Sequence, residues 1–352
     1  MRVLVTGGSG YVGSHAVREL AAAGHDVVIY DNLSTGLRRL CEGFKLVEGD
    51  IADTAKVTHS LKGMDAVMHF AASSYVGESL VNPRKYFRNN VESGLSLLDA
   101  VLSSPVRMFV FSSSCAIYGI PRQLPITEDC PQEPVNPYGA SKLFLEHALA
   151  AYSAAHGLRY AALRYFNAAG AHPDGAIGEY HDPETHLIPL ALKAVAGSKP
   201  ALRVFGKDLK TPDGTCIRDF IHVTDLGSAH VKALEYLAKG GSSIRLNLGT
   251  GTGTSISQLL DVIAKVTGKE VPHEFANARA GDPPSLYADP RKARQVLGWS
   301  AKIGLDEIVS TAWKWEQKVS AMRFLETPQQ VLAGMRQESL LTTSAVSDIG
   351  FS

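Results

Sequence analysis

The sequence predicts an α/β fold built on a doubly wound parallel sheet, with a smaller α/β region towards the C-terminus. In the first half of the chain, short runs of β-branched residues alternate with longer segments of helical periodicity. These runs are apolar throughout, as expected for strands that are buried on both faces of a parallel sheet. Ligands of such sheets bind outside the carboxyl ends of the strands, so functional residues are expected at that edge.

The first strands are expected at residues 2–6, 26–30, 44–48, 65–69 and 107–113. The clearest helix is expected at 11–23, where apolar residues recur on one face. Two later runs, 217–222 and 244–248, are expected to return to the sheet, so that the two halves of the chain interleave. Residues 170–186 are rich in Gly, Pro, His and Asp, which predicts a long loop. The polar segment 321–352 is compatible with helix up to about residue 340 and carries no motif.

Charge balance and cysteine content narrow the possible classes. The 352-residue chain holds 35 basic and 35 acidic residues, so its formal net charge is zero and nucleic-acid binding is not favoured. The cysteines form no CxxC pair, which argues against a disulfide framework or zinc site and fits a reducing compartment. No signal-peptide pattern is present and no apolar run reaches the ~20 residues of a membrane span. We therefore expect a soluble, cytoplasmic protein.

A glycine-rich turn follows the first strand and opens the first helix, with the sequence Thr6-Gly7-Gly8-Ser9-Gly10-Tyr11-Val12-Gly13. Glycine permits a tight turn and a close backbone approach to a pyrophosphate, and the helix N-terminus favours negative charge. Asp31 ends the second strand, where a carboxylate accepts hydrogen bonds from ribose hydroxyls and repels a 2′-phosphate. No arginine immediately follows it. The turn therefore predicts a Rossmann-type site that prefers NAD to NADP.

Tyr138 and Lys142 are spaced to lie on one face of a helix, and Pro137 suits the first turn of that helix. A phenol with an unperturbed pKa near 10 is a poor base, so we expect the Lys142 ammonium and the positive nicotinamide ring of NAD⁺ to lower the pKa of Tyr138. The phenol can then accept a proton from a sugar hydroxyl while hydride leaves the carbon. Serines at 112–114 end the fifth strand, at the edge where they can meet this tyrosine.

These motifs resemble those of the UDP-glucose 4-epimerases (UDP-galactose 4-epimerases), which belong to the extended short-chain dehydrogenase/reductase family. The GxxGxxG spacing of the glycine turn is typical of that family, and the resemblance extends to about residue 318. Besides the turn, it is carried by segments 31–33, 49–51, 69–72, 76–79, 89–91, 111–114, 138–142, 163–167 and 218–223.

The resemblance implies a division of the chain and a set of site residues. Residues 1–170 form an NAD-binding Rossmann domain with a returning segment at about 217–250, residues 171–320 form an interleaved UDP-sugar-binding region, and 321–352 form a tail of unknown role. The catalytic residues are Ser114, Tyr138 and Lys142. The residues expected to contact NAD are Gly7, Gly10, Tyr11, Val12, Gly13, Asp31, Asn32, Asp50, Ile51, Phe70, Ala71, Ala72, Asn89, Tyr138, Lys142 and Phe166. The residues expected to bind the UDP-sugar are Ser114, Tyr138, Asn167, His186, Leu187, Arg218, Arg279 and Asp282.

Some positions bear on ligand preference. The two arginines of the substrate set suit a diphosphate, because guanidinium groups offer paired donors at fixed geometry. Ser74 stands where some relatives carry a lysine near the dinucleotide, and His186 stands where an asparagine often binds the nucleotide. Leu286 occupies the position that sets the room around the sugar, and leucine leaves acceptance of N-acetylated sugars open.

The implied reaction inverts C4 of the sugar. Tyr138 removes the 4-hydroxyl proton while the C4 hydride passes to NAD⁺, and the 4-keto sugar then turns and receives the hydride on its other face. A sugar-nucleotide dehydratase is the nearest rival, but its signature places a carboxylate just after the catalytic Ser/Thr, whereas Ser114 is followed by Cys-Ala-Ile-Tyr-Gly. We therefore expect interconversion of UDP-glucose and UDP-galactose. The alternative is a 4-epimerase of UDP-N-acetylhexosamines or of UDP-xylose and UDP-arabinose.

Four further expectations follow from the sequence and from the resemblance. The chain retains Ser114, Tyr138 and Lys142, which disfavours a non-catalytic NAD-sensing protein of the same fold. The loop histidines His172, His181 and His186 match no metal-ligand spacing, so no metal is expected. The glycine run 249–253 lacks the P-loop ending and predicts a turn before a helix capped by Thr254 or Ser255. A homodimer through helices of the cofactor domain is implied by the resemblance.

Overall fold

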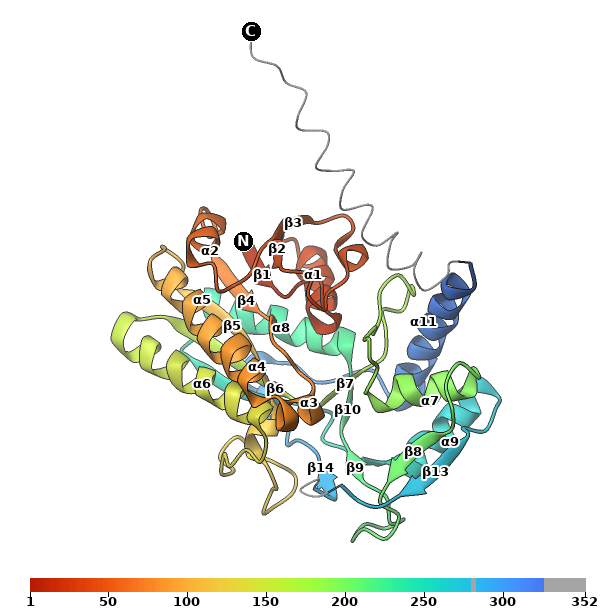
Figure 1. Cartoon of the computed structure of the whole chain (residues 1–352). Coiled ribbons are helices and arrows are strands. Elements are labelled where there is room, and N and C mark those ends of the chain that lie inside the picture. Colours follow the sequence, from red (N-terminus) through yellow and green to blue (C-terminus); the bar gives the residue numbers. More distant parts are fainter. Residues whose placement is uncertain (280–282, 326–352) are drawn as a thin grey trace.

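Seven parallel strands form the central sheet of the computed structural model, which describes residues 1–279 and 283–325 (Figure 1). Their order across the sheet is β11–β6–β5–β4–β1–β2–β3. The strands are β1 (Arg2–Thr6), β2 (Asp26–Asp31), β3 (Lys45–Glu48), β4 (Ala66–His69), β5 (Met108–Ser114), β6 (Arg159–Tyr165) and β11 (Ile244–Leu248). The doubly wound α/β fold is confirmed, and each strand expected in the first half lies within one residue of its predicted bounds.

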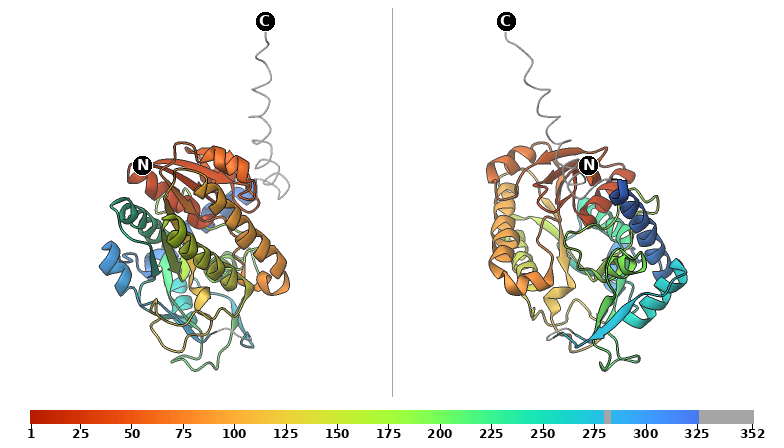
Figure 2. Two further views of the ribbon diagram at one scale, coloured as in Figure 1. Left: turned by 90° about the vertical axis from the view of Figure 1, so that its left-hand side faces the viewer. Right: turned by 45° about the vertical axis from the view of Figure 1, so that its right-hand side comes forward.

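Helices cover both faces of this sheet. The helix α1 (Tyr11–Ala22) and the later helix α8 (Val223–Ala238) pack on one face, and α2 (Thr54–Ser60), α5 (Ser93–Leu102) and α6 (Pro137–His156) pack on the other. Figure 2 shows these layers on either side of the strands. Buried apolar side chains fill the space between each layer and the sheet. The strands are apolar on both faces because both faces are covered.

The run at 217–222 does not join the central sheet, so that expectation is wrong. The run splits at Asp219, and its second part pairs with a strand that follows β6, while its first part lies between two other short strands. The place beside β6 is taken by residues 244–248, as predicted. The short strands of this region are β7 (Asn167–Ala169), β9 (Ile217–Arg218), β10 (Phe220–His222), β12 (Thr254–Ser255) and β14 (Ser285–Leu286).

A separate apolar cluster holds the C-terminal part together. It joins α7 (Leu187–Val195), α9 (Ile256–Thr267) and α11 (Leu305–Leu325) to a parallel pair of strands, β8 (Leu202–Phe205) and β13 (His273–Ala276). Ser255 begins α9 with a capping box, which confirms the predicted cap after the glycine run. The part of the expected C-terminal helix beyond residue 325 lies outside the described residues.

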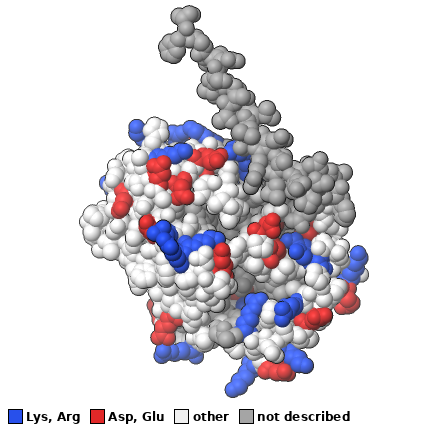
Figure 3. All heavy atoms as spheres, viewed as in Figure 1, with Lys and Arg blue, Asp and Glu red and all other residues white. Residues whose placement is uncertain are grey.

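The remaining short elements connect these layers. They are η1 (Arg38–Cys41), α3 (Val76–Val81), α4 (Pro83–Tyr86), the π-helical turn η2 (Phe87–Glu92), η3 (Cys115–Tyr118) and α10 (Arg291–Leu297). Acidic and basic side chains are intermixed on the face shown in Figure 3. Over the described part of the chain, no helix has both the length and the apolar character to cross a bilayer.

Candidate active site

The glycine turn between β1 and α1 leaves no space for a side chain at Gly7 or at Gly13. Gly7 has a φ of +75°, and a Cβ there would lie 2.4 Å from the backbone nitrogen of Ala71. A Cβ on Gly13 would lie 2.2 Å from the carbonyl oxygen of Gly7. Gly10 is the N-cap of α1 and has no side chain to cap it. The backbone N–H groups that begin α1 are therefore available to an anion brought close to the turn.

Asp31 lies beside this turn at the end of β2. Its carboxylate accepts hydrogen bonds from the backbone N–H groups of Ser9 at 3.0 Å and Leu33 at 2.8 Å. Burial raises the pKa of Asp31, whereas these hydrogen bonds lower it. The Asn32 amide donates to the Asp50 carboxylate at 2.8 Å. The ends of β2 and β3 are thus joined next to the glycine turn.

The segment after β4 lies at the same edge of the sheet, where the carboxyl ends of β1, β2 and β3 also lie. The backbone N–H groups of Phe70 and Ala71 both donate to the carbonyl oxygen of Thr6, at 2.8 and 3.1 Å. The expected cofactor residues therefore lie at neighbouring strand ends of one sheet edge, as the parallel topology requires. This set is Gly7, Gly10, Tyr11, Val12, Gly13, Asp31, Asn32, Asp50, Ile51, Phe70, Ala71 and Ala72.

Asn90, which the sequence reasoning passed over in favour of Asn89, connects this edge to the catalytic helix. Its side chain accepts from the backbone N–H of Ser73 at 2.8 Å and donates to the Ser141 hydroxyl of α6 at 2.9 Å. Asn89 itself donates to the Asn90 side chain at 3.0 Å. The sequence shows two adjacent asparagines, either of which could have been the functional one. Only the packing of η2 against α6 distinguishes their roles.

Ser114, Tyr138 and Lys142 meet at the carboxyl end of β5, with exposed fractions of 7%, 8% and 4%. The Lys142 ammonium donates to the carbonyl oxygen of Ser112 at 2.8 Å and lies 5.9 Å from the centre of the Tyr138 ring. The Ser114 hydroxyl is hydrogen-bonded to the Tyr138 phenol and accepts from the backbone N–H of Ala116 at 3.1 Å. The three residues expected to be catalytic are therefore neighbours.

Burial dominates the protonation of this group, contrary to the expected effect of the lysine. It raises the pKa of Tyr138, with a further increase from the nearby Tyr165, while the hydrogen bond with Ser114 lowers it. Burial also lowers the pKa of Lys142 to about 7. The physical reason is that a water-poor site disfavours both the phenolate and the ammonium. The lysine alone does not make Tyr138 a base here.

Gly139 lets the catalytic helix approach the strand end closely. A Cβ at this position would lie 2.4 Å from the carbonyl oxygen of Ala116 in η3. Asn136 caps α6 by accepting the backbone N–H of Gly139 at 2.8 Å, and Pro137 occupies the first turn as predicted. This close approach sets Tyr138 beside Ser114 and was not foreseen from the sequence.

A buried ion pair between β6 and α6 contacts β5, the strand that ends at Ser114. Arg164 of β6 and Glu146 of α6 are fully buried, with the Arg164 Nη2 nitrogen 2.6 Å from a Glu146 carboxylate oxygen. The same carboxylate accepts the Ser113 hydroxyl at 2.6 Å, and Arg164 donates to the Tyr118 hydroxyl at 2.8 Å. The network ties β5, η3, β6 and α6 together around the catalytic residues.

Asn167 of β7 and Arg218 of β9, both expected to bind the UDP-sugar, make hydrogen bonds within the protein. The Asn167 amide donates to the carbonyl oxygen of Asp219 at 3.1 Å, and the Arg218 guanidinium donates to the carbonyl oxygen of Pro283 at 2.9 Å. Asp219, which the sequence reasoning did not single out, accepts from the backbone N–H of Thr250 at 2.9 Å and of Ala288 at 3.2 Å. This carboxylate sets the glycine run and the segment after β14 next to Arg218.

Leu286 and Arg279 are further residues with an expected role that the structure describes. Leu286 is paired with Arg218 across β14 and β9, and with Phe166 it packs in an apolar cluster that includes Cys115, next to the catalytic serine. The Arg279 guanidinium lies 3.8 Å from the centre of the Phe205 ring. Asp282 lies outside the described residues.

His186 and Leu187 begin α7 at the end of the long loop. The His186 ring lies 6.3 Å from the Tyr75 ring, and the carbonyl oxygen of Tyr75 accepts the Tyr86 hydroxyl at 2.6 Å. The Tyr86 ring in turn lies 6.4 Å from the Tyr138 ring. The start of α7 is thus connected to the catalytic tyrosine through two aromatic residues.

Comparisons with known proteins agree on one group of enzymes. Residues 3–249 match the NAD dependent epimerase/dehydratase family. The UDP-glucose 4-epimerase of Lactobacillus helveticus is 50% identical over 321 residues, covering 90% of this chain and 97% of that protein. The structure of UDP-glucose 4-epimerase from Brucella ovis in complex with NAD is 53% identical with a TM-score of 0.87, covering 89% and 97% of the two chains. That of the Bifidobacterium longum enzyme with NAD⁺ and UDP is 37% identical with a TM-score of 0.86, covering 90% and 98%.

Proposed function

Because the chain belongs to the NAD dependent epimerase/dehydratase family and, within it, to the UDP-glucose 4-epimerases, we propose that it is an isomerase that interconverts UDP-glucose and UDP-galactose with NAD as its cofactor. The observation that carries this proposal is the buried group of Ser114, Tyr138 and Lys142 at the carboxyl end of β5. No carboxylate follows Ser114 in η3, so the site offers no added acid or base there for elimination.

In this mechanism Tyr138 and Ser114 handle the proton of the sugar 4-hydroxyl. The phenol accepts the proton, and the Ser114 hydroxyl holds the reacting oxygen and the phenol in line by hydrogen bonding to both. The Lys142 side chain donates to the carbonyl oxygen of Ser112, and its ammonium form places a positive charge near the Tyr138 phenol. After the 4-keto sugar has turned about its diphosphate linkage, Tyr138 returns the proton to the oxygen on the other face.

When bound, NAD would supply the acceptor, and then the source, of the C4 hydride. The glycine turn fits its pyrophosphate, because Gly7 leaves backbone rather than side chain facing Ala71 and α1 begins uncapped. Tyr138 needs a further positive charge nearby to act as a base near neutral pH, since burial opposes both the phenolate and the Lys142 ammonium.

The substrate half is proposed to hold the nucleotide and the sugar. Arg218 and Arg279 bind the diphosphate, and Asn167, His186, Leu187 and Asp282 bind the remainder of the UDP-sugar. Leu286 packs close to the catalytic serine through the cluster with Cys115 and Phe166, which supports its role in limiting the space around the sugar. We propose a preference for hexoses because the relatives compared are UDP-glucose 4-epimerases.

We further propose a homodimer formed through the cofactor half. Large apolar side chains are exposed on α3, η2 and α6, namely Val76, Leu80, Val81, Phe87 and Phe144. The Phe87 and Phe144 rings lie 6.4 Å apart, so they belong to one patch. Exposed patches of this kind mark protein interfaces. A monomeric wild-type protein in light scattering would contradict the dimer, whereas a dimer that Phe144→Glu dissociates would support it.

The proposed reaction also sets a cellular context. The described cysteines are buried free thiols, which fits a reducing compartment. We propose a cytoplasmic enzyme of galactose metabolism, because the reaction connects UDP-galactose with UDP-glucose.

One assay tests the reaction directly. Purified protein is incubated with UDP-galactose, and formation of UDP-glucose is measured, with UDP-GlcNAc and UDP-xylose in parallel. Turnover of UDP-galactose supports the proposal, and faster turnover of an alternative sugar changes the preferred substrate. Accumulation of a 4-keto-6-deoxy sugar would support a dehydratase, and no turnover of any sugar by NAD-containing protein would overturn the proposal.

Tyr138→Phe tests the assigned base. It removes the phenolic hydroxyl without changing the packing, so turnover should fall by at least about 100-fold. The bound NAD, measured after denaturation, should remain at the wild-type level. Tyr152→Phe is the matched control, because Tyr152 is on the same helix and its hydroxyl contacts only Asp99 among the described hydrogen bonds, at 3.4 Å. Wild-type activity in Tyr138→Phe would refute the assignment.

A further inference from the structure

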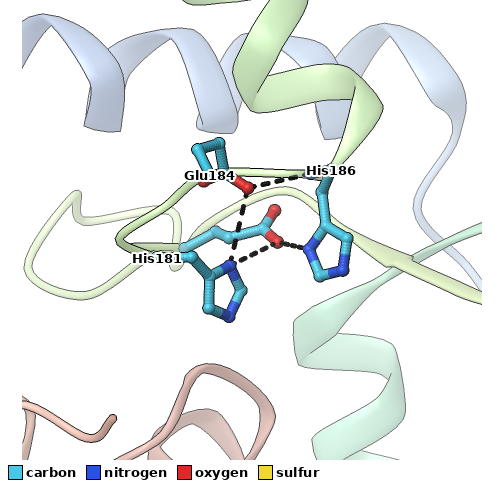
Figure 4. A group of neighbouring side chains, drawn as sticks. His181, Glu184 and His186 are labelled. Carbon is cyan, nitrogen blue, oxygen red and sulfur yellow. Dashed lines mark hydrogen bonds and ion pairs between the residues drawn. The ribbon is translucent and has the colours of Figure 1, made fainter. Parts of the chain in front are cut away.

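We propose that Glu179, His181, Glu184 and His186 form a binding site for a divalent transition-metal ion with zinc-like preferences, which fastens the long loop to the body of the protein. These residues, here called the Glu/His cluster, come from one short stretch of the loop before α7. Figure 4 shows the side chains turned toward one another. The proposed function assigns His186 to the UDP-sugar but gives Glu179, His181 and Glu184 no role.

The geometry of the cluster suits one small ion. Each residue offers one ligand atom, and these four atoms all lie within 4.8 Å of one another. The His181 Nδ1 is 3.3 Å from a Glu179 oxygen and 3.6 Å from a Glu184 oxygen. Four ligands at about 2.1 Å from a tetrahedral zinc ion are separated by roughly 3.4 Å. The His186 Nδ1 contacts the same Glu179 oxygen. The four ligand atoms are therefore close enough to one another to share a single ion, which would separate the Glu179 and His186 atoms from their direct contact.

Burial and charge add a second, independent argument. The carboxylates of Glu179 and Glu184 are only 6% and 2% exposed, and His181 is 14% exposed. Neighbouring carboxylates out of water require compensating positive charge. Lys193 supplies one such charge, 3.5 Å from the second oxygen of Glu184. The other oxygen of Glu184 also accepts the backbone N–H of His186 at 2.9 Å, which orients the carboxylate toward the cluster.

The donor set indicates the class of metal. Imidazole nitrogen with carboxylate oxygen is typical of zinc and its first-row neighbours, whereas magnesium and calcium prefer oxygen alone. His186 has a side chain that is 44% exposed, so an ion can enter from solvent on that side. The expectation of no metal considered the histidine spacing alone. The two glutamates between and before the histidines complete the donor set.

The position of the cluster points to a structural role. The His181 ring packs 6.4 Å from Tyr11 of the glycine turn and 5.6 Å from Tyr75, and Tyr11 donates to the carbonyl oxygen of Gly170 at 2.6 Å. The carbonyl oxygen of Glu179 accepts the indole N–H of Trp315 in α11 at 2.7 Å. A metal ion here would join the loop, α7 and α11 next to the cofactor turn. It lies outside the group of Ser114, Tyr138 and Lys142, so it takes no part in proton transfer.

The same contacts could instead persist as ion pairs without metal. In that arrangement the glutamates raise the pKa of His181 to about 9 and that of His186 as well, although burial opposes both increases. Protons and a metal ion compete for the same nitrogen atoms. Direct metal measurement separates the two arrangements.

The experiment measures metal content and its effect on stability in the NAD-containing protein. After purification without chelator or metal-affinity tags, elemental analysis should give close to one zinc equivalent per chain. Dialysis against a chelator should remove it, lower the unfolding temperature and speed proteolysis in the loop, and zinc should reverse each change. Cobalt added to the chelated protein should give the visible absorption of a tetrahedral site at one equivalent.

The variants test which residues bind the ion. His181→Gln and Glu184→Gln should each weaken zinc binding by about 100-fold or more, because each removes one ligand. His172→Gln is the matched control, since His172 lies in the same loop but pairs with Asp174 at 2.8 Å outside the cluster. If the variants fail to fold, chelator treatment and zinc addition with the wild-type protein still show whether it binds zinc. Zinc well below one equivalent with no change of unfolding temperature on addition of metal, or equal loss in His172→Gln, would overturn the proposal.

Discussion

The expected cofactor region around Gly7 and Gly139, here called the cofactor half, and the expected substrate region from the loop before α7 to Asp219 and Ala288, here called the substrate half, are held together in different ways. In the cofactor half, the contacts depend on missing side chains: a Cβ on Gly7 would meet the backbone of Ala71 at 2.4 Å, and one on Gly139 would meet that of Ala116 at 2.4 Å. In the substrate half, distant loops are joined by buried carboxylates. Asp219 binds the backbone of Thr250 and Ala288, and the Glu/His cluster fastens the loop before α7.

Histidines show the same contrast. His69, buried between strands of the cofactor half, has its pKa lowered to about 3 by burial, so it is neutral, and its ring nitrogen contacts the Thr6 hydroxyl at 2.7 Å. His181 in the substrate half lies against two carboxylates instead. Close backbone approach and a neutral histidine therefore surround the glycine turn, whereas charged side chains surround the loop before α7. This difference predicts that substitutions in the cofactor half reduce NAD affinity, whereas substitutions in the substrate half raise KM for the UDP-sugar.

The largest effect is expected from Gly7→Ala. The added methyl group must displace the Ala71 backbone, and the residue also keeps a positive φ, so the combined cost is about 3 kcal/mol or more. NAD affinity should fall by on the order of 100-fold or more, measured as bound NAD per chain after gel filtration.

Gly24→Ala is the matched control for this substitution. Gly24 has a φ of +80°, but no other atom lies within 4 Å of the position that an added Cβ would take. The substitution should cost only about 1–2 kcal/mol of stability from the backbone conformation and leave NAD bound. Equal NAD loss in both variants would show that φ, and not close approach, controls the site.

An intermediate effect is expected from Asp219→Asn. The amide presents an N–H₂ group to backbone N–H donors, which leaves buried donors without an acceptor at a cost of about 1–3 kcal/mol. The glycine run and β14 should then shift relative to Arg218, so KM for the UDP-sugar should rise by about tenfold while bound NAD is unchanged. Asp261→Asn on the exposed face of α9 is the control. Loss of NAD together with UDP-sugar affinity would mean that the two halves are not separable.

The smallest effect concerns acid stability. Because the folded pKa of His69 lies below its unfolded value near 6.5, its stability contribution is complete above pH 6.5 and is lost as pH falls toward 3. Between pH 6 and pH 5 the loss is about 1 kcal/mol. His69→Gln should remove this part of the pH dependence in urea unfolding, whereas the exposed His156→Gln should not. An unchanged slope in His69→Gln would place the acid sensitivity elsewhere.

The sequence predicted local features well and long-range ones less well. Strand bounds, the glycine turn and the cap at Ser255 depend on neighbours along the chain, and the structure confirms them. The place of 217–222 was wrong, because β11 takes the position next to β6 and local apolarity does not encode which run pairs there. Asn90 was also missed, because its partners Ser73 and Ser141 belong to other segments.

The direction of the pKa change at Tyr138 was also beyond what the sequence could predict. The spacing of Tyr138 and Lys142 correctly places both on the buried face of α6. The sign of the pKa change at Tyr138 did not follow from that spacing, because the removal of water outweighs the attraction of an ammonium that burial itself disfavours.

By itself, the sequence determined the parallel α/β fold and the glycine turn, because each depends on residue type at short spacing, and it predicted Ser114, Tyr138 and Lys142 as the catalytic residues. Only the tertiary structure decided which carboxylates hold the substrate half, how closely α6 approaches β5 at Gly139, and that Glu179 and Glu184 meet His181 and His186. Those features arise from distances between segments and from exclusion of water, and neither can be inferred from the spacing of residues along the chain.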